Sequence, residues 1–355
     1  MSVPLRVGVV GAGIAERHVE AFRQRPALFS VPVLCSLDEP RGRALCAKHG
    51  VAEFTTDFDA LLERDDIDVI DICTPPSSHY PLGSQALAAG RHVICEKPLF
   101  GSLAEVDRIA ALLQPGSPRL MPIFQYRFGT GLSKLRHLVA LGLAGEPIMS
   151  TVETHWWRGP AYYDVPWRGR WATELGGGLL GHAIHAHDML SCVHGDIAEL
   201  FAFGATRVNA IEVEDTMALS LRMANGSLAA LSMTLGSREE ISRLRFCFKR
   251  LTAESCLAPY APGRDPWRFV AGDEAHQREV DAALAALPAH DDGYLRQFEL
   301  FHEALATGGE LPVTLADARR SLELVTAAYH SQRTGQAVKL PLDAHHPLHE
   351  SWLPR

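Results

Sequence analysis

The stretch RHVICEKP, residues 91–98, joins a short apolar run to a lysine that precedes a proline. The run is typical of a buried strand in a parallel sheet. Proline disfavours the helical conformation of the residue before it, so we expect Lys97 to be extended at the carboxyl end of this strand. Ligands bind at that edge of open parallel sheets. Lys97 is therefore a candidate base, because burial or a nearby positive charge can lower the pKa of an amine; an ordinary solvated lysine is the alternative.

A glycine-containing turn lies near the N-terminus, where VVGAGIA follows an apolar run and opens a helical segment. Gly11 and Gly13 would let the backbone approach a pyrophosphate, whose charge the amino end of a helix favours. Ile14 and Ala15 complete the turn, and Glu16 stands where a third glycine is usual, so we expect a shortened loop. These residues predict dinucleotide binding through Gly11, Gly13, Ile14 and Ala15; a tight turn without a ligand is the alternative.

The segment CSLD, residues 35–38, bears on which dinucleotide would bind. A dinucleotide site usually presents an acid to the ribose hydroxyls at this point, and Ser36 stands there instead. Serine weakens the discrimination against a 2′-phosphate, which Arg41 or Arg43 could bind. Asp38 could bind the ribose hydroxyls, which would favour NAD. The alternative is that Asp38 caps the following helix. The sequence leaves NAD and NADP both open.

Aromatic and arginine side chains are concentrated between residues 155 and 171, which contain four of the six tryptophans. Aromatic faces and guanidinium forks suit a polyhydroxylated or anionic ligand, whereas a packed core or an interface between copies is the alternative. Another candidate lies in the segment Gln125–Phe128. The predicted ligand-binding side chains of these two segments are Arg127, His155, Trp157, Arg158 and Tyr163.

Three histidines and an acid follow in GHAIHAHD, residues 181–188. Histidine titrates near neutral pH, so His182 and His185 are candidates for proton transfer and substrate binding. If the segment is helical, these two side chains share one face. A packed or solvent-facing histidine is the alternative for His182 and His187. The residue types also suit a metal, but no upstream carboxylate ligand is present and we expect no metal.

These candidate residues need elements to position them, and the first ~120 residues alternate strand and helix patterns. Strands are expected at residues 5–10, 31–37, 69–73 and 92–95, and helices at 15–24, 41–49, 81–89 and 103–113. Apolar strands separated by helices predict an α/β fold with a doubly wound parallel sheet.

The pattern changes after Pro147. Strand-like runs cover residues 148–157, 197–208, 215–223, 227–235 and 242–251, and late helices are expected at 294–306 and 315–334. The tripeptide Ala224-Asn225-Gly226 is a hairpin signal between two of the runs. We expect a Rossmann-type dinucleotide-binding domain over residues 1–122 and a second domain, with an antiparallel sheet, over residues 123–355.

Composition limits the functional classes. With 47% hydrophobic and 21% charged residues, the 355-residue chain is typical of a globular protein. A formal charge of -8 argues against nucleic acid or an anionic membrane as partner, and no apolar run is long enough to cross a bilayer. The seven cysteines are scattered and never spaced Cys-x-x-Cys, which predicts free thiols and a cytoplasmic location.

Taken together, the motifs resemble the Gfo/Idh/MocA oxidoreductase family. The glycine turn, the TPPSSH of residues 74–79, Glu96-Lys97-Pro98, and Gly177-Gly178 leading to His185 follow that family's order over nearly the whole chain. The resemblance implies a Rossmann domain, a C-terminal α/β domain with a large, mostly antiparallel sheet, and homodimers or homotetramers formed through that sheet. It also implies NAD or NADP as cofactor and a sugar, inositol, polyol or sugar acid as substrate.

The resemblance also implies roles for single residues. Lys97 matches the catalytic lysine and His185 the family's histidine, whereas Gly181 replaces an acid that is frequently catalytic in the family. This departure leaves Lys97 and His185 as the expected proton-handling pair, with His182 as a partial substitute for the acid. The positions that match cofactor contacts in the family are Thr74, Pro75, His79, Glu96, Lys97, Trp167 and Arg168.

The expected chemistry is hydride transfer from a carbinol carbon to the nicotinamide. Lys97 would take the hydroxyl proton and His185 would relay it. Two other functions stay open: an NAD-dependent lyase or glycosidase with only transient redox change, and a regulator that binds a dinucleotide and catalyses nothing.

Overall fold

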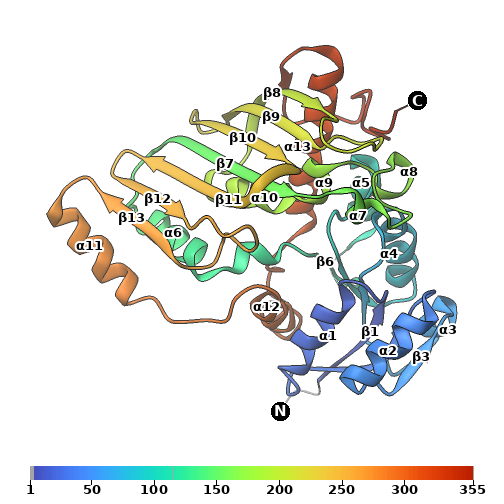
Figure 1. Cartoon of the computed structure of the whole chain (residues 1–355). Coiled ribbons are helices and arrows are strands. Elements are labelled where there is room, and N and C mark those ends of the chain that lie inside the picture. The colour runs from blue at the N-terminus through green and yellow to red at the C-terminus, as the bar shows by residue number, and fades with distance from the viewer. Residues whose placement is uncertain (1–3, 115, 355) are drawn as a thin grey trace. The chain divides into compact units, whose positions relative to one another are not determined.

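The computed structural model describes residues 4–114 and 116–354, which form two compact units (Figure 1). The first unit contains the chain up to Ile123 together with Tyr294–Ala318. The second contains Phe124–Gly293 and the chain from Arg319 onward. The second domain, expected to run without interruption over residues 123–355, thus lacks Tyr294–Ala318, which the structure groups with the N-terminal unit.

The first unit is built on a six-stranded parallel sheet in the order β3-β2-β1-β4-β5-β6. Its strands are β1 Leu5–Val10, β2 Phe29–Cys35, β3 Glu53–Thr55, β4 Val69–Ile72, β5 His92–Cys95 and β6 Leu120–Pro122. The central strands are almost wholly buried, which explains why they are continuous apolar runs. The predicted doubly wound sheet is confirmed, and its order reverses between β1 and β4, where such folds bind ligands.

Helices accompany this sheet, and local sequence fixes several of their ends. Asp38 and Ser102 cap the amino ends of their helices through side-chain oxygens, and Gly50 closes one helix in the left-handed conformation. The helices are α1 Ala15–Arg23, α2 Glu39–His49, α3 Phe58–Leu62, α4 His79–Ala88, α5 Leu103–Leu112 and α12 Tyr294–Thr307, with a 3-10 turn at η1 Pro76–Ser78. In Figure 1, α12 lies beside α1, and Phe298 stacks on Phe22 with ring centroids 4.3 Å apart.

The second unit contains an eight-stranded sheet in the order β13-β12-β11-β7-β10-β9-β8-β14. Its strands are β7 Pro147–Trp157, β8 Ile197–Ala205, β9 Thr216–Met223, β10 Leu228–Thr234, β11 Gly236–Phe248, β12 Leu251–Ser255, β13 Trp267–Ala271 and β14 Val338–Lys339. Neighbours are antiparallel apart from β7 and β10, which confirms a mostly antiparallel sheet. The predicted hairpin joins β9 to β10, with Gly226 at φ 88°. The predicted strand 242–251 is confirmed as far as Phe248, where β11 ends; Lys249 and Arg250 then separate β11 from β12.

Helices cover part of this sheet. Their bounds are η2 Gln125–Phe128, α6 Thr130–Ala140, α7 Pro160–Tyr163, α8 Trp171–Glu174, α9 Gly178–Gly181, α10 Ile184–His194, α11 Glu274–Ala285 and α13 Leu315–Thr334. α9 contacts β9 and β10, and α10 contacts β7 and β11. Neither α6 nor α11 was predicted from the sequence.

All seven cysteines lie in the described residues and are free thiols, and four of them are buried. Within residues 4–114 and 116–354, no helix combines the length and the apolar character that crossing a membrane requires.

Candidate functional site

The glycine turn after β1 has the shape that a dinucleotide needs. Gly11 has φ +114° and donates its N–H to the carbonyl of Cys35, and a Cβ at Gly11 would lie 2.6 Å from the carbonyl oxygen of Cys73. Only glycine fits this approach of the turn to the end of β4. A Cβ at Gly13, in contrast, would meet no described atom within 4 Å. This open space in front of α1, which begins at the buried Ala15, suits a pyrophosphate.

The residues after β2 are engaged with their own backbone. The Ser36 hydroxyl accepts the N–H of Asp38 at 3.2 Å, and Asp38 accepts the N–H of Arg41 at 3.2 Å as the cap of α2. The capping alternative for Asp38 is thus present in the structure. Leu37, between them, is 91% exposed.

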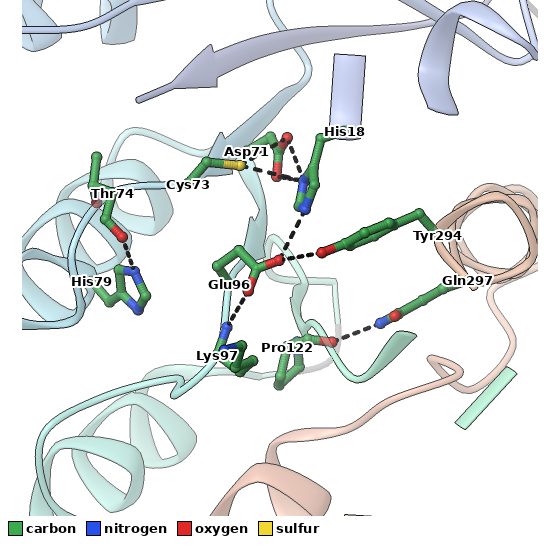
Figure 2. A network of polar contacts seen from close by, with 10 residues as sticks. All are labelled: His18, Asp71, Cys73, Thr74, His79, Glu96, Lys97, Pro122, Tyr294 and Gln297. Atoms are coloured by element: carbon green, nitrogen blue, oxygen red, sulfur yellow. Dashed lines mark hydrogen bonds and ion pairs between the residues drawn. The ribbon is translucent and has the colours of Figure 1, made fainter. Parts of the chain in front are cut away.

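A buried polar network lies behind Lys97 (Figure 2). His18 of α1 is wholly buried, with Nδ1 2.9 Å from Asp71 Oδ2 and Nε2 3.1 Å from Glu96 Oε1. The Tyr294 hydroxyl of α12 donates to Glu96 Oε1 at 2.8 Å, and the backbone N–H of Lys97 donates to Glu96 Oε2 at 3.0 Å. Glu96 therefore fixes the backbone of the half-buried Lys97.

Opposite charges on His18 and its two carboxylate partners stabilise this network. Burial opposes the positive charge of His18, but the Asp71 carboxylate outweighs it and holds the pKa of His18 well above its ordinary value. Burial likewise opposes the negative charge of Glu96, but the hydrogen bond from His18 lowers the pKa of Glu96 to about 2. An imidazolium thus lies between two buried carboxylates. His18, Asp71 and Cys73 group their donor atoms closely, but a protonated imidazole has no lone pair for a metal.

His79 ties two turns together. Its ring is wholly buried, with Nε2 2.8 Å from the carbonyl oxygen of Thr74 and Nδ1 2.8 Å from that of Pro98. Burial lowers the pKa of His79, so the neutral ring donates to one of these oxygens at a time. The predicted cofactor-contact segment Thr74-Pro75 is thereby connected to the turn that carries Lys97.

In the second unit, one cluster combines arginines, aromatic rings and a histidine. The guanidinium of Arg158 lies over Trp156 at 5.1 Å, and that of Arg168 lies over Tyr162 at 3.7 Å and over Trp167 at 4.6 Å. The Tyr162 hydroxyl is 3.1 Å from Nε2 of the buried His182. We name Trp156, Arg158, Tyr162, Arg168 and His182 the arginine–aromatic cluster; sequence reasoning had not selected Trp156 or Tyr162.

The structure does not bring every predicted residue to this cluster. Alternate side chains of a strand point to opposite faces, so His155 and Trp157 lie on the other face of β7 from the buried Trp156. His155 Nε2 is 2.9 Å from the Ser232 hydroxyl, and the guanidinium of Arg238 covers the Trp157 ring. His155 and Trp157 were grouped with Arg158 from sequence proximity, which ignores this alternation.

The histidine segment is not one helix. α9 ends at Gly181 and α10 begins at Ile184, so His182 and His185 do not share a helical face as expected. His185 is buried and stacks on Tyr126, with ring centroids 4.3 Å apart. Burial lowers the pKa of His187 to about 3, so this residue is a neutral packed histidine.

Arg127, a predicted substrate ligand, is buried and forms a two-pronged ion pair with Asp188: Nε lies 3.1 Å from Oδ2, and Nη2 contacts Oδ1 at 2.5 Å. This pair fixes η2 against α10, which carries His185. The geometry therefore gives Arg127 a positioning role within the unit.

Close packing explains why glycine stands at the start of α9. A Cβ at Gly177 would lie 1.8 Å from the Glu214 carbonyl oxygen, and the Glu214 carboxylate accepts the N–H groups of Gly177 and Leu179 at 3.0 Å each. The Tyr329 hydroxyl donates to the same carboxylate at 3.0 Å. These contacts fix the entry to the histidine segment.

Comparison with known proteins agrees with this geometry. Residues 5–124 match a family model described as an oxidoreductase family with an NAD-binding Rossmann fold, and residues 132–253 match the GFO/IDH/MocA C-terminal domain. Fold and site together define an NAD-binding oxidoreductase. The chain belongs to the Gfo/Idh/MocA oxidoreductase family.

Relatives share almost the full length of the chain. D-glucoside 3-dehydrogenase of Escherichia coli is 29% identical, covering 96% of this chain and 98% of its own. Myo-inositol 2-dehydrogenase of Thermotoga maritima is 27% identical, covering 95% and 98%. Among solved structures, the WlbA dehydrogenase of Bordetella pertussis in complex with NADH and UDP-GlcNAcA superposes with a TM-score of 0.83 at 26% identity, covering 96% of this chain and 100% of that one.

Proposed function

We propose that the protein is an NAD-dependent dehydrogenase that oxidises a CH–OH group of a sugar, inositol, related polyol or sugar acid. The observation that carries this function is the half-buried Lys97 at the end of β5, whose backbone Glu96 and His18 hold in place. Relatives named as glucoside and inositol dehydrogenases support the substrate class.

The residues present fit a dinucleotide. The space beside Gly13 and the amino end of α1 would hold the pyrophosphate, and the Thr74-Pro75 turn and Lys97 would lie at the nicotinamide end. When bound, the nicotinamide accepts a hydride. Ser36 leaves the ribose without the usual acid, so the assay includes both NAD and NADP.

Proton transfer falls to Lys97 and His185. A hydroxyl is a weak acid, so its oxidation needs a positioned base. Lys97 would remove the hydroxyl proton, and His185, oriented by the Tyr126 ring, would pass it on. The Arg127–Asp188 pair keeps the helix of His185 in place. In this proposal Arg158, Tyr163 and His182 bind the hydroxyls of the substrate.

A panel of sugars, inositols, polyols and sugar acids, scored by reduced-nicotinamide absorbance with NAD and with NADP, tests this function. We expect at least one compound to reduce NAD, and Lys97→Ala to abolish most of that turnover while NADH binding is kept. Lys249→Ala, at an exposed lysine of the second unit, is the matched control. Substrate consumption without net NAD reduction would indicate the lyase or glycosidase alternative. Dinucleotide binding with no turnover on any compound would indicate the regulator.

We also propose that the protein forms homodimers or homotetramers through the eight-stranded sheet. α9 and α10 contact one face, whereas Phe203 on β8 is 69% exposed, and Glu153, Arg243 and Glu254 place both charge signs on neighbouring strands. Mixed charges and exposed aromatic rings suit a self-complementary contact between copies. Phe203→Glu should lower the mass measured by light scattering, and Leu37→Glu in the first unit should not.

A reducing, cytoplasmic compartment is proposed for the same protein. Its seven cysteines are all free thiols, which is typical of proteins kept reduced. Fractionation of the source cells would test this location.

A further inference from the structure

The turn between β2 and α2 lies where a Rossmann unit receives the ribose of the adenosine. Gly11, in the pyrophosphate turn, donates its N–H to the Cys35 carbonyl at 2.8 Å, so the residue after Cys35 begins beside that turn. This residue is Ser36, which is 7% exposed and donates its own N–H to the Thr55 carbonyl at 3.0 Å. The backbone on both sides of β2 therefore fixes the position of Ser36.

The residue type at this position bears on which dinucleotide can bind. A carboxylate here accepts the ribose hydroxyls of NAD and repels the 2′-phosphate of NADP. Ser36 brings no charge, and its hydroxyl accepts the N–H of Asp38 at 3.2 Å. A hydroxyl can also donate its own proton to a phosphate oxygen. Position 36 therefore does not exclude a 2′-phosphate.

Asp38, the acid two residues further on, serves the helix. Its Oδ1 accepts the N–H of Arg41 at 3.2 Å, and its backbone carbonyl accepts the N–H of Gly42 at 2.8 Å. A Cβ at Gly42 would lie 2.3 Å from the Phe54 ring, so the first turn of α2 packs closely against β3. Asp38 is thus the cap of a helix whose start is fixed, and this role accounts for it without any contact to a ribose.

The two arginines near the start of α2 differ in what holds them. Arg43 donates from Nε to Glu39 Oε1 at 2.8 Å, and its guanidinium lies 4.9 Å from the centre of the Phe54 ring. Arg41 is exposed, and no described residue forms a hydrogen bond or an ion pair with its guanidinium. Arg43 is therefore held against β3 and its own helix, whereas Arg41 is available to an anion.

Arg41 also stands apart from the rest of its helix. The other charged side chains of α2 all have partners: Glu39 with Arg43, and Lys48 and His49 with Glu16 of α1. Two successive hydrogen bonds, through Asp38, join the backbone of Arg41 to the Ser36 hydroxyl. The guanidinium thus originates close to Ser36, and a guanidinium fork matches the oxygens of a phosphate.

We propose that Ser36 and Arg41 form a binding site for the 2′-phosphate of NADP, so that the protein binds NADPH at least as tightly as NADH. The serine hydroxyl and the guanidinium would both donate to phosphate oxygens. This site rests on the dinucleotide binding in the proposed function and specifies which dinucleotide is bound. Its test measures binding and needs no substrate.

The experiment titrates the purified full chain with NADH and with NADPH, followed by fluorescence. Adenosine 5′-phosphate and adenosine 2′,5′-bisphosphate, which differ only in the 2′-phosphate, then compete with NADH. We expect NADPH to bind at least as tightly as NADH, and the bisphosphate to displace NADH more strongly than the monophosphate. Arg41→Ala should lower the affinity for NADPH about tenfold more than the affinity for NADH, because it removes a hydrogen bond between charged groups. Alanine suits an exposed helical position, so this variant should fold.

Two further variants complete the test. Ser36→Asp introduces the usual acid and should lower the affinity for NADPH about tenfold or more relative to NADH, because a carboxylate repels the phosphate. Arg43→Ala is the matched control, since it removes an arginine of the same helix that Glu39 and Phe54 already hold. It should leave the ratio of the two affinities unchanged.

Three results overturn the site: NADPH that binds more weakly than NADH in the wild type, an Arg41→Ala variant that changes both affinities equally, and an Arg43→Ala variant that selectively weakens NADPH. If Ser36→Asp does not fold, Arg41→Glu places the opposing charge on an exposed residue. Arg41→Glu should weaken NADPH binding selectively, and an equal effect on both dinucleotides also overturns the site.

These outcomes are separate from the dehydrogenase activity. Wild-type protein that binds both dinucleotides but reduces neither with any compound removes the proposed activity, while the 2′-phosphate site stands. Turnover with NAD, together with NADPH binding that is weaker than NADH binding, removes the 2′-phosphate site alone.

Discussion

Replacement of His18 by glutamine tests whether a buried ion network holds Lys97. Glutamine keeps N–H donors in its amide, but it removes the positive charge between Asp71 and Glu96 and replaces one of the two ring donors by a carbonyl oxygen. Both carboxylates are buried, so neither can be rehydrated cheaply. We therefore expect a large loss of stability and a loss of activity in the same variant.

The magnitude follows from Glu96. Lowering its pKa from 4.5 to about 2 corresponds to about 3 kcal/mol of folding free energy, in which the hydrogen bond from His18 is the largest favourable contribution. Removing one partner of a buried ion pair costs about 3–5 kcal/mol in proteins generally. We expect His18→Gln to lower the free energy of unfolding by about 3 kcal/mol.

The pH dependence has a definite sign. Glu96 has a lowered pKa, so its contribution is complete above its unfolded value and is lost as pH falls from about 4.5 to about 2. His18 has a raised pKa, so its contribution is complete below about pH 6.5 and declines as pH rises from there. The difference between wild type and His18→Gln should therefore be largest between about pH 4.5 and 6.5.

Urea unfolding at several pH values measures this difference, and kcat with the panel substrate measures the effect on Lys97. His49→Gln is the matched control, because His49 pairs at 3.1 Å with Glu16, whose side chain is 40% exposed. Loss of such a surface pair should change the stability far less than loss of the buried His18. A His18→Gln variant that resembles His49→Gln in stability and in pH dependence would refute the buried ion network.

Three further perturbations have defined outcomes. Lys97→Ala should reduce kcat by roughly 10²–10⁴-fold, measured by steady-state NAD reduction, and full activity would exclude Lys97 as the base. Gly11→Ala should lower the free energy of unfolding in urea by about 1–3 kcal/mol, because the added Cβ would meet the Cys73 carbonyl. Gly13→Ala should keep the stability but weaken NADH binding in a fluorescence titration. Trp352→Ala should cost about 3–5 kcal/mol in the same unfolding assay, because the wholly buried indole donates to the Leu175 carbonyl at 2.7 Å. A cost below about 1 kcal/mol would show that Trp352 is not part of the core.

Local signals predicted much of the fold. Buried parallel strands are continuous apolar runs, and capping residues and glycines mark the ends of helices, so the Rossmann unit could be read from residues 5–113. The short strands β3, β6, β13 and β14 and the helices α6 and α11 were not predicted, and β12 was joined to β11 in one predicted strand. A two-residue turn of charged side chains does not interrupt a strand pattern, and α11 has only two buried residues to mark its inner face.

The site was harder to predict, because its contacts join residues far apart in sequence. Glu96 stands beside Lys97 in the chain, and its motif could be recognised. His18 meets Glu96 only after α1 packs on the sheet, and Tyr294 meets it across 198 positions of sequence.

The packing of α12 in the first unit has a consequence for how the protein is made. Phe298 and Phe301 are fully buried there, and Gln297 donates to the Pro122 carbonyl at 2.8 Å. During synthesis, the first 123 residues emerge from the ribosome long before this helix exists, and until then an aromatic part of their core stays open to water. A fragment that ends near the first boundary should consequently expose apolar surface and aggregate, whereas the same fragment linked to Tyr294–Ala318 should be recoverable as a folded dinucleotide-binding unit.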